Sequence, residues 1–334
     1  MIPSTLLVPK PEGLYCPPGD FYIDPVKRVD HALITHGHSD HARKGHTHVM
    51  ATAPTLAFMR ARYGANFARQ STVTEFGTAH NINGVDVSFH PAGHVLGSAQ
   101  IRLSMNGMTI VASGDYKREP DPASEDFEVV PCDVFITEAT FALPIFRHPP
   151  ALEEINKLIA SVNLFPDHVH VVGAYSLGKT QRVLGLLRSA GYEKPIYIAD
   201  SAVLMTQIYA DHGIEFGDIR EANKTPPRDL IGAIIVGPHG KGMGLDRPDI
   251  PPVRRSFASG WLSVKSKRWS GNVDFPLVIS DHCDWDELCT TIRETGAREI
   301  WVTHGSEAAL IHWCRSEGLT ARPLHLVGYD GEDQ

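Results

Sequence analysis

A run of metal-ligand side chains lies near the N-terminus, in the segment THGHSDH that begins at Thr35. It places His36, His38, Asp40 and His41 within six residues, directly after the apolar stretch ALI. Imidazole nitrogens and carboxylate oxygens are common zinc ligands, and alternate residues of an extended backbone point the same way. We therefore expect the first three side chains to face one point and His41 another, an arrangement that suits two neighbouring metal ions. A polar loop without metal is the alternative.

Three further candidate ligands each follow an apolar run. His94 comes after VDVSFH, Asp115 after TIVASG and His304 after EIWVT, and each has a glycine as its neighbour. A single Asp or His after a strand is commonly a turn or cap residue, so each is weak evidence alone. Strand ends hold side chains rigidly, and the joint placement of the three predicts that they complete the metal ligands.

The composition is that of a folded protein with a sizeable core. The chain has 334 residues, of which 42% are hydrophobic and 21% charged, so it forms one large domain or two ordinary ones. The net charge of −8 argues against a uniformly basic nucleic-acid binder. The span 220–270, however, holds ten Lys or Arg against four Asp or Glu. This local excess indicates either a nucleic-acid contact, with Trp261 and Trp269 available for base stacking, or a solvated face.

Several features predict a cytoplasmic protein. The five cysteines are widely spread with no C-x-x-C pair, which is typical of free thiols in a reducing compartment. The N-terminal residues lack a basic segment followed by a long apolar one, so no secretory signal is evident. No run of about 18 apolar residues occurs, which excludes a membrane-spanning helix.

Apolar runs and amphipathic segments alternate along the chain. The first ~140 residues are rich in strands, and Asn106-Gly107 predicts a tight hairpin. A strand that enters a loop is expected over 31–36. The middle of the chain alternates strand and helix, as parallel sheets do. Helices are expected over 54–64, 151–162, 180–191, 201–213, 286–296 and 307–318.

The metal-ligand motifs resemble those of a known fold. H-x-H-x-D-H, a Gly-His before a Gly-Ser, and a Ser-Gly-Asp together are similar to the motifs of the metallo-β-lactamase fold. In FYIDP, Asp24 resembles the aspartate that braces the metal loop in that family. The resemblance implies two zinc ions, with manganese also suited to these ligands. It assigns His36, His38 and His94 to the first ion, Asp40, His41 and His304 to the second, and Asp115 to a bridge between them.

The rest of the chain resembles one branch of this fold, the β-CASP nucleases. Glu138 in TEAT, His282 in SDHCDW and His304 in VTHG are similar to the three extra motifs of that group. About 140 residues separate TEAT from ISDH, enough for the inserted domain of these proteins. The implied fold class is α/β: a metallo-β-lactamase αββα sandwich formed by residues 1–142 and 279–334, with an α/β β-CASP domain inserted over 143–278.

The resemblance is greatest to the bacterial DNA ligase-associated exonucleases, which are Artemis-like. It implies a metal-dependent phosphodiesterase, a DNA exonuclease in DNA repair that uses a hydroxide activated by two zinc ions. On this resemblance His282 is the general acid, Glu138 holds its imidazole, and Asp40 counts as both ligand and catalytic residue. The implied partners are nucleic acid, with DNA favoured over RNA, a DNA ligase and a helicase.

Other functions stay open. At the third extra motif the RNA-processing branch resembled here has histidine, and this chain has His304. This favours a β-CASP ribonuclease with the same metals. A small-ester or lactam hydrolase of the same fold would not use Glu138 or His282. A binding platform with a vestigial site would hold no metal.

The segment GAYSLGKT, residues 173–180, matches the phosphate-loop pattern G-x-x-x-x-G-K-[ST] and lies between an expected strand and helix. We interpret it as a loop that presents Ser176, Lys179, Thr180 and backbone N–H groups to a substrate phosphate. A structural turn and a nucleotide-binding loop are the alternatives.

Overall fold

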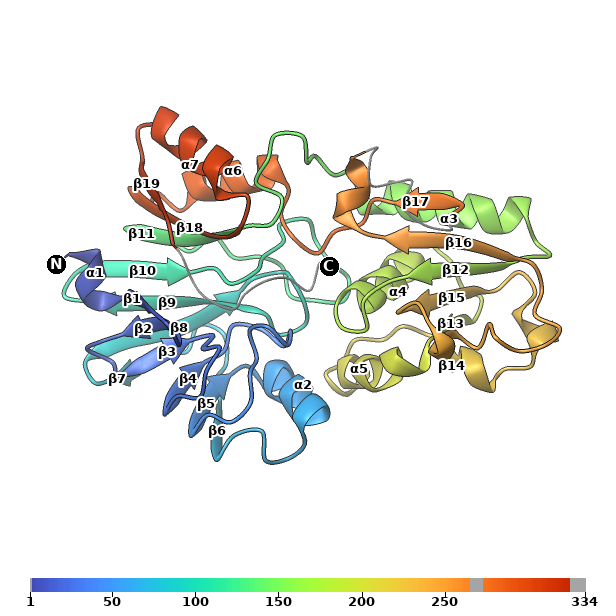
Figure 1. Cartoon of the computed structure of the whole chain (residues 1–334), viewed down its shortest axis with the longest axis horizontal. Coiled ribbons are helices and arrows are strands. Elements are labelled where there is room, and N and C mark those ends of the chain that lie inside the picture. The colour runs from blue at the N-terminus through green and yellow to red at the C-terminus, as the bar shows by residue number, and fades with distance from the viewer. Residues whose placement is uncertain (1, 265–272, 325–334) are drawn as a thin grey trace. The chain divides into compact units, whose positions relative to one another are not determined.

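The structure, a computed structural model, describes residues 2–264 and 273–324 and divides the chain into two compact units (Figure 1). Unit 1 comprises residues 1–120, 124–144 and 282–334, and unit 2 comprises 121–123 and 145–281. The domain limits predicted at 142/143 and 278/279 remain a prediction. Residues 325–334 of the last predicted segment, and residues 265–270 of the basic span with Trp269, lie outside the described residues.

Unit 1 contains two β-sheets. The first has the strand order β1-β2-β3-β4-β5-β6, and the second has the order β19-β18-β11-β10-β9-β8-β7. The strands of the first sheet are β1 Val8–Lys10, β2 Gly13–Cys16, β3 Phe21–Ile23, β4 His31–Leu33, β5 His48–Ala51 and β6 Gln70–Val73. Those of the second are β7 His80–Ile82, β8 Val85–Pro91, β9 Ala99–Met105, β10 Met108–Ala112, β11 Val134–Ala139, β18 Glu299–Gly305 and β19 Thr320–Pro323.

One apolar cluster joins the facing sides of the two sheets. Alternate residues of a strand point to opposite faces, and accordingly Val85, Val87 and Phe89 of β8 all enter this cluster. Phe21 and Leu33 reach it from the first sheet. The alternating apolar residues of the sequence therefore form the core between the two sheets.

Helices cover the outer face of each sheet, and Figure 1 shows α2 beside β5 and β6, and α6 and α7 beside β18. Leu288 of α6 and Leu310 of α7 share a buried cluster with Val302 of β18. Leu56 of α2 is buried with Val49 of β5. The layers are thus helix, sheet, sheet and helix, which confirms the predicted metallo-β-lactamase sandwich. The helices of unit 1 are α1 Pro3–Leu6, α2 Ala53–Tyr63, α6 Trp285–Glu294 and α7 Glu307–Ser316.

Unit 2 is built on a parallel sheet with the strand order β14-β13-β15-β12-β16-β17. Its central strands β12 and β15 are buried along their whole length, because helices cover both faces of parallel sheets. The strands are β12 Val169–Gly173, β13 Ile196–Ile198, β14 Ile219–Glu221, β15 Ile234–Gly237, β16 Val253–Ala258 and β17 Phe275–Leu277. The helices are α3 Ala151–Leu164, α4 Lys179–Ser189 and α5 Asp200–Asp211, with short 3₁₀ turns at Ala222–Lys224, Pro227–Leu230, Lys241–Met243 and Gly260–Ser263.

Most expected elements are present. Asn106 and Gly107 have φ values of 50° and 78° and join β9 to β10 as the predicted hairpin. All six expected helices occur within two residues of their predicted starts. Residues 31–36, expected as a strand that enters a loop, form β4 as far as Leu33. The chain then leaves the sheet and enters the histidine-rich loop.

None of the helices within 2–264 and 273–324 is both long enough and apolar enough to cross a membrane. The five cysteines are free thiols, as expected.

Candidate metal centre

Four candidate residues lie at one edge of the second sheet of unit 1. β10, β11 and β18 are mutually parallel, and β8 runs in the same direction because it pairs with β9 antiparallel, as β9 does with β10. The carboxyl ends of these strands therefore meet at a single edge. Asp115 follows β10 and His94 follows β8, while Glu138 and His304 lie in the last residues of β11 and β18.

The histidine-rich loop meets this edge. His36, His38, His94 and Asp115 are all buried, and one possible ligand atom from each lies within 4.8 Å of the others. Asp115 Oδ2 is 3.6 Å from His36 Nε2 and 3.8 Å from His94 Nε2. His94 Nε2 is 3.0 Å from His38 Nδ1. The structure thus brings the imidazoles of His36 and His94 to one oxygen of Asp115, with His38 next to His94.

The same carboxylate oxygen also faces a second group of residues. His41 Nε2 lies 3.5 Å from Asp115 Oδ2 and 3.7 Å from Asp40 Oδ2. The rings of His41 and His304 are 5.3 Å apart between centroids. Asp115 therefore lies between two sets of candidate ligands, where the resemblance predicts a bridging carboxylate.

The end of β18 is shaped by an unusual backbone. His304 has a φ of 54°, which is uncommon for a residue other than glycine, and Gly305 follows with a φ of 119°. A Cβ added to Gly305 would lie 2.2 Å from the carbonyl oxygen of Ala139. Glycine is required here because β18 and β11 approach so closely, and the turn directs His304 out of the ladder.

Burial keeps the imidazoles of His36 and His304 neutral. Burial, together with the neighbouring imidazoles of His41 and His94, places the pKa of His36 well below its ordinary value. Burial lowers the pKa of His304 to about 3, and His41 contributes in the same direction. A neutral imidazole has the lone pair that a metal ion needs.

The neighbouring carboxylates have the opposite effect on the pKa of His41. Burial alone would lower the pKa of His41, but Asp115, Asp40 and Asp24 outweigh it and raise the pKa to about 10. Burial raises the pKa of Asp115 to about 7. The raised pKa of His41 indicates that its imidazole is protonated in the metal-free cluster, and a bound cation would take the place of that proton.

A network behind the cluster orients two of the rings. Asp24 accepts hydrogen bonds from the backbone N–H of Thr35 at 2.8 Å and from its hydroxyl at 2.5 Å. Asp24 Oδ2 also lies 2.8 Å from His41 Nδ1, and the Thr35 hydroxyl is 3.0 Å from His36 Nδ1. If both Nδ1 atoms carry the hydrogen, as these partners favour, each Nε2 is left as an electron-pair donor. The sequence reasoning did not single out Thr35, whose only signal was its position directly before His36.

The donor set fits a transition-metal ion. His36 Nε2 and Asp40 Oδ1 are buried, and neither has a hydrogen-bond partner within the described part of the chain. Buried polar atoms of this kind are costly unless something pairs with them. Nitrogen and carboxylate oxygen at such positions suit zinc or manganese.

A histidine–glutamate pair lies beside the cluster. His282 Nδ1 is 2.9 Å from Glu138 Oε2, and the rings of His282 and His94 are 4.6 Å apart between centroids. Glu138 is buried and accepts a hydrogen bond of 2.8 Å from the backbone N–H of Tyr116. The carboxylate therefore fixes the imidazole at Nδ1. Tyr116 was not predicted, because a backbone donor leaves no signal in the residue type.

The loop 173–180 lies in unit 2 and uses its polar groups internally. Lys179 is only 4% exposed, and its ammonium group lies 2.5 Å from Asp281 Oδ1. The Thr180 hydroxyl donates to the carbonyl oxygen of Tyr175, and the carbonyl oxygen of Ser176 accepts from the side-chain amide of Gln181. These bonds support a structural turn, so the phosphate-binding role stays a prediction.

The chain is similar in sequence to several known proteins. No family model matches the chain. It is 28% identical over 313 residues to a probable DNA ligase of Opitutus terrae, which covers 92% of this chain and 30% of that protein. It is 31% identical over 237 residues to the endoribonuclease YSH1 of Gibberella zeae, which covers 58% of this chain and 28% of that one. The chain thus spans about 30% of the length of these curated relatives.

The fold also matches a solved structure. A crystal structure of a protein of unknown function from Enterococcus faecalis V583 superposes with a TM-score of 0.54 at 10% identity. The match covers 81% of this chain and 74% of the other and concerns the fold alone.

Two substitutions in the cluster should lower its metal content to different extents. His36→Ala removes a ligand from one side of Asp115, so it should lower the bound metal while the other side still binds. Asp115→Ala should deplete both sides, because Asp115 Oδ2 faces both. The measurement is metal content by plasma mass spectrometry after equilibration with zinc and removal of the excess.

The exposed His31 of the same unit provides the control, since His31→Ala should retain the wild-type metal content. Circular dichroism shows whether each variant is folded. Wild-type metal content in folded Asp115→Ala protein would contradict the bridging position.

Proposed function

We propose that the chain, which resembles the β-CASP group of the metallo-β-lactamase fold, is a metal-dependent nuclease that hydrolyses phosphodiester bonds. One observation carries the proposal: a buried set of histidines and aspartates lies next to a histidine that is held by a buried glutamate. The first set fits metal ions, and the pair fits proton transfer. Phosphodiester hydrolysis needs both.

The metal-holding residues are proposed to act as two sets. His36, His38 and His94 form one set, Asp40, His41 and His304 form the other, and Asp115 belongs to both. When bound, zinc or manganese ions would supply Lewis acidity that polarises the phosphoryl oxygens and activates water. The protein's own part is to keep the Nε2 atoms available, and Asp24 and Thr35 support this through Nδ1 of His41 and His36.

His282 is proposed to be the general acid. Glu138 accepts the hydrogen bond from Nδ1, so Nε2 is the atom that can give a proton to the departing oxygen. Glu138 stabilises the imidazolium form before the transfer. Because Tyr116 N–H and burial immobilise the glutamate, the imidazole is held in a fixed orientation.

DNA is the proposed substrate, in a repair reaction carried out as an exonuclease alongside a DNA ligase. The relative that matches 92% of this chain is named a probable DNA ligase, and its remaining length lies outside the match. The endoribonuclease relatives match smaller parts of the chain, 58% and 34%. Their names nevertheless favour RNA as the second candidate substrate.

Replacement of the proposed acid separates chemistry from metal binding. His282→Ala should retain its metal and lose about 10²–10⁴-fold in turnover, the usual contribution of a positioned acid. Glu138→Gln should lower turnover as well and shift the pH–rate profile, because it removes the charge that stabilises the imidazolium. Single-turnover cleavage of a labelled oligonucleotide over a range of pH values measures both effects.

The exposed His312 supplies a matched histidine control, and His312→Ala should cleave at the wild-type rate. A metal-loaded His282→Ala protein that also cleaves at that rate would refute the role of His282.

The substrate class is tested with matched molecules. DNA and RNA oligonucleotides of one sequence, each 5′-phosphorylated or 5′-hydroxylated, and circular single-stranded DNA are incubated with the metal-loaded protein. Linear DNA should be shortened from an end while circular DNA stays intact. Faster cleavage of RNA than of matched DNA would assign the chain to the ribonuclease branch, and opening of the circle would exclude a purely exonucleolytic mode.

A further inference from the structure

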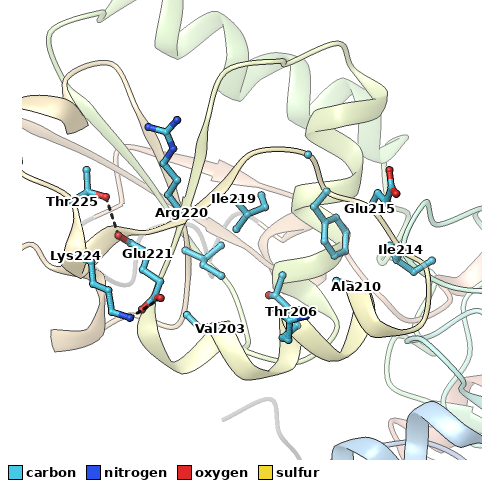
Figure 2. Close-up of a pocket in the computed structure, with 14 residues that line it drawn as sticks. Val203, Thr206, Ala210, Ile214, Glu215, Ile219, Arg220, Glu221, Lys224 and Thr225 are labelled. Carbon is cyan, nitrogen blue, oxygen red and sulfur yellow. Dashed lines mark hydrogen bonds and ion pairs between the residues drawn. The ribbon is translucent and has the colours of Figure 1, made fainter.

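A groove outside the metal centre runs along unit 2, between α5 and the strand β14. Its volume is about 670 Å³, within the range of roughly 300–1,000 Å³ typical of ligand-binding pockets. Val203, Thr206 and Ala210 line it from one face of α5, and Ile219 lines it from β14 (Figure 2). Phe216 and Ile198 are buried in its floor. The groove therefore has an apolar floor with polar residues such as Gln207 and Thr225 also in its lining, and the backbone of β14 forms one of its sides.

That backbone belongs to an edge strand. β14 is the last strand in the sheet order, and among the described residues it pairs with β13 alone. In a parallel ladder, alternate residues direct their N–H and C=O groups away from the partner. An extended chain can add to such an edge and place every second side chain in the neighbouring groove.

The charges at the rim leave one group uncompensated. Arg220 pairs with Asp218 through two hydrogen bonds, and Lys224 pairs with Glu221 at 2.8 Å. Glu215 is exposed at the end of the groove, and its side chain has no hydrogen bond or ion pair within the described part of the chain. The groove thus presents an unpaired negative charge beside apolar surface (Figure 2).

We propose that this groove docks an extended segment of a partner protein, with an apolar side chain inside it and a neighbouring lysine or arginine against Glu215. The segment would add to the free edge of β14. The same groove of a second copy fits less well, because it brings another Glu215 together with Arg220 and Lys224, which already have partners. The role is additional to the proposed nuclease function, since none of these residues belongs to the metal centre.

The test is a selection from random peptides of about 12 residues, displayed on phage and applied to the immobilised full chain. Peptides that bind the Ala210→Arg variant are removed first. Ala210 is exposed and lines the groove, so arginine there fills it while remaining compatible with a helix. The enriched peptides should combine an apolar residue with an adjacent lysine or arginine.

Binding of a labelled enriched peptide is then measured by fluorescence polarisation. Ala210→Arg should raise Kd by at least about tenfold, and Glu215→Lys should do the same by charge repulsion. Leu204→Arg is the matched control, because Leu204 is 52% exposed on the same helix and does not line the groove. Its Kd should stay at the wild-type value, and nuclease activity should be unchanged in all three variants.

Three results would overturn the proposal. The first is the absence of any peptide that distinguishes the wild-type chain from Ala210→Arg. The second is enrichment of acidic peptides. The third is a dimer in sedimentation experiments that Ala210→Arg dissociates, which would assign the groove to a second copy of the chain.

Discussion

Burial of many ligand-type side chains at one point is the constraint on which the site depends. His36, His41 and His94 each lie within 3.8 Å of one oxygen of Asp115, and His38 belongs to the same buried group. Water is largely excluded, so each unpaired nitrogen or oxygen costs free energy that solvent does not restore. A cation offsets this cost by accepting several lone pairs at once. The arrangement is therefore more favourable with a metal ion than without one, and the lowered pKa values of His36 and His304 agree with this.

The fold supplies this constraint through strand direction. Residues far apart in the chain meet because β8, β10, β11 and β18 end at the same edge of a sheet. The core between the two sheets and the outer helices fixes these strands. Local backbone and hydrogen-bond features then orient individual side chains. Gly305 allows β18 to approach β11, and the Asp24–Thr35 network turns two imidazoles.

Local patterns made much of the fold and the candidate site predictable. The hairpin at Asn106-Gly107 follows from residues that tolerate positive φ, and the helices follow from their apolar periodicity. The ligand set was predicted because dense H-x-H-x-D-H spacing and strand-end residues are visible in the sequence itself. The short strands β1 to β3 had no comparable signal, since three or four residues are held by their ladder partners more than by propensity.

Contacts between residues far apart in the sequence could not be predicted, for a related reason. Lys179 meets Asp281 across 102 positions, so the loop 173–180 was interpreted from its pattern without its main partner. The backbone donor of Tyr116 and the groove beside β14 arise from packing, which no single segment encodes. Residue type and spacing thus identify which chemistry is present, and the tertiary structure decides which groups remain available for it.

Anomalous X-ray diffraction from crystals of the zinc-loaded chain tests the central claim most directly. Data collected on both sides of the zinc absorption edge should show strong peaks within about 2.0–2.2 Å of ligand atoms of the cluster, the usual zinc–ligand distances. The peaks should flank Asp115, with His36 on one side and His41 on the other. An absence of peaks there, or a peak only at an exposed histidine such as His31, would contradict the account.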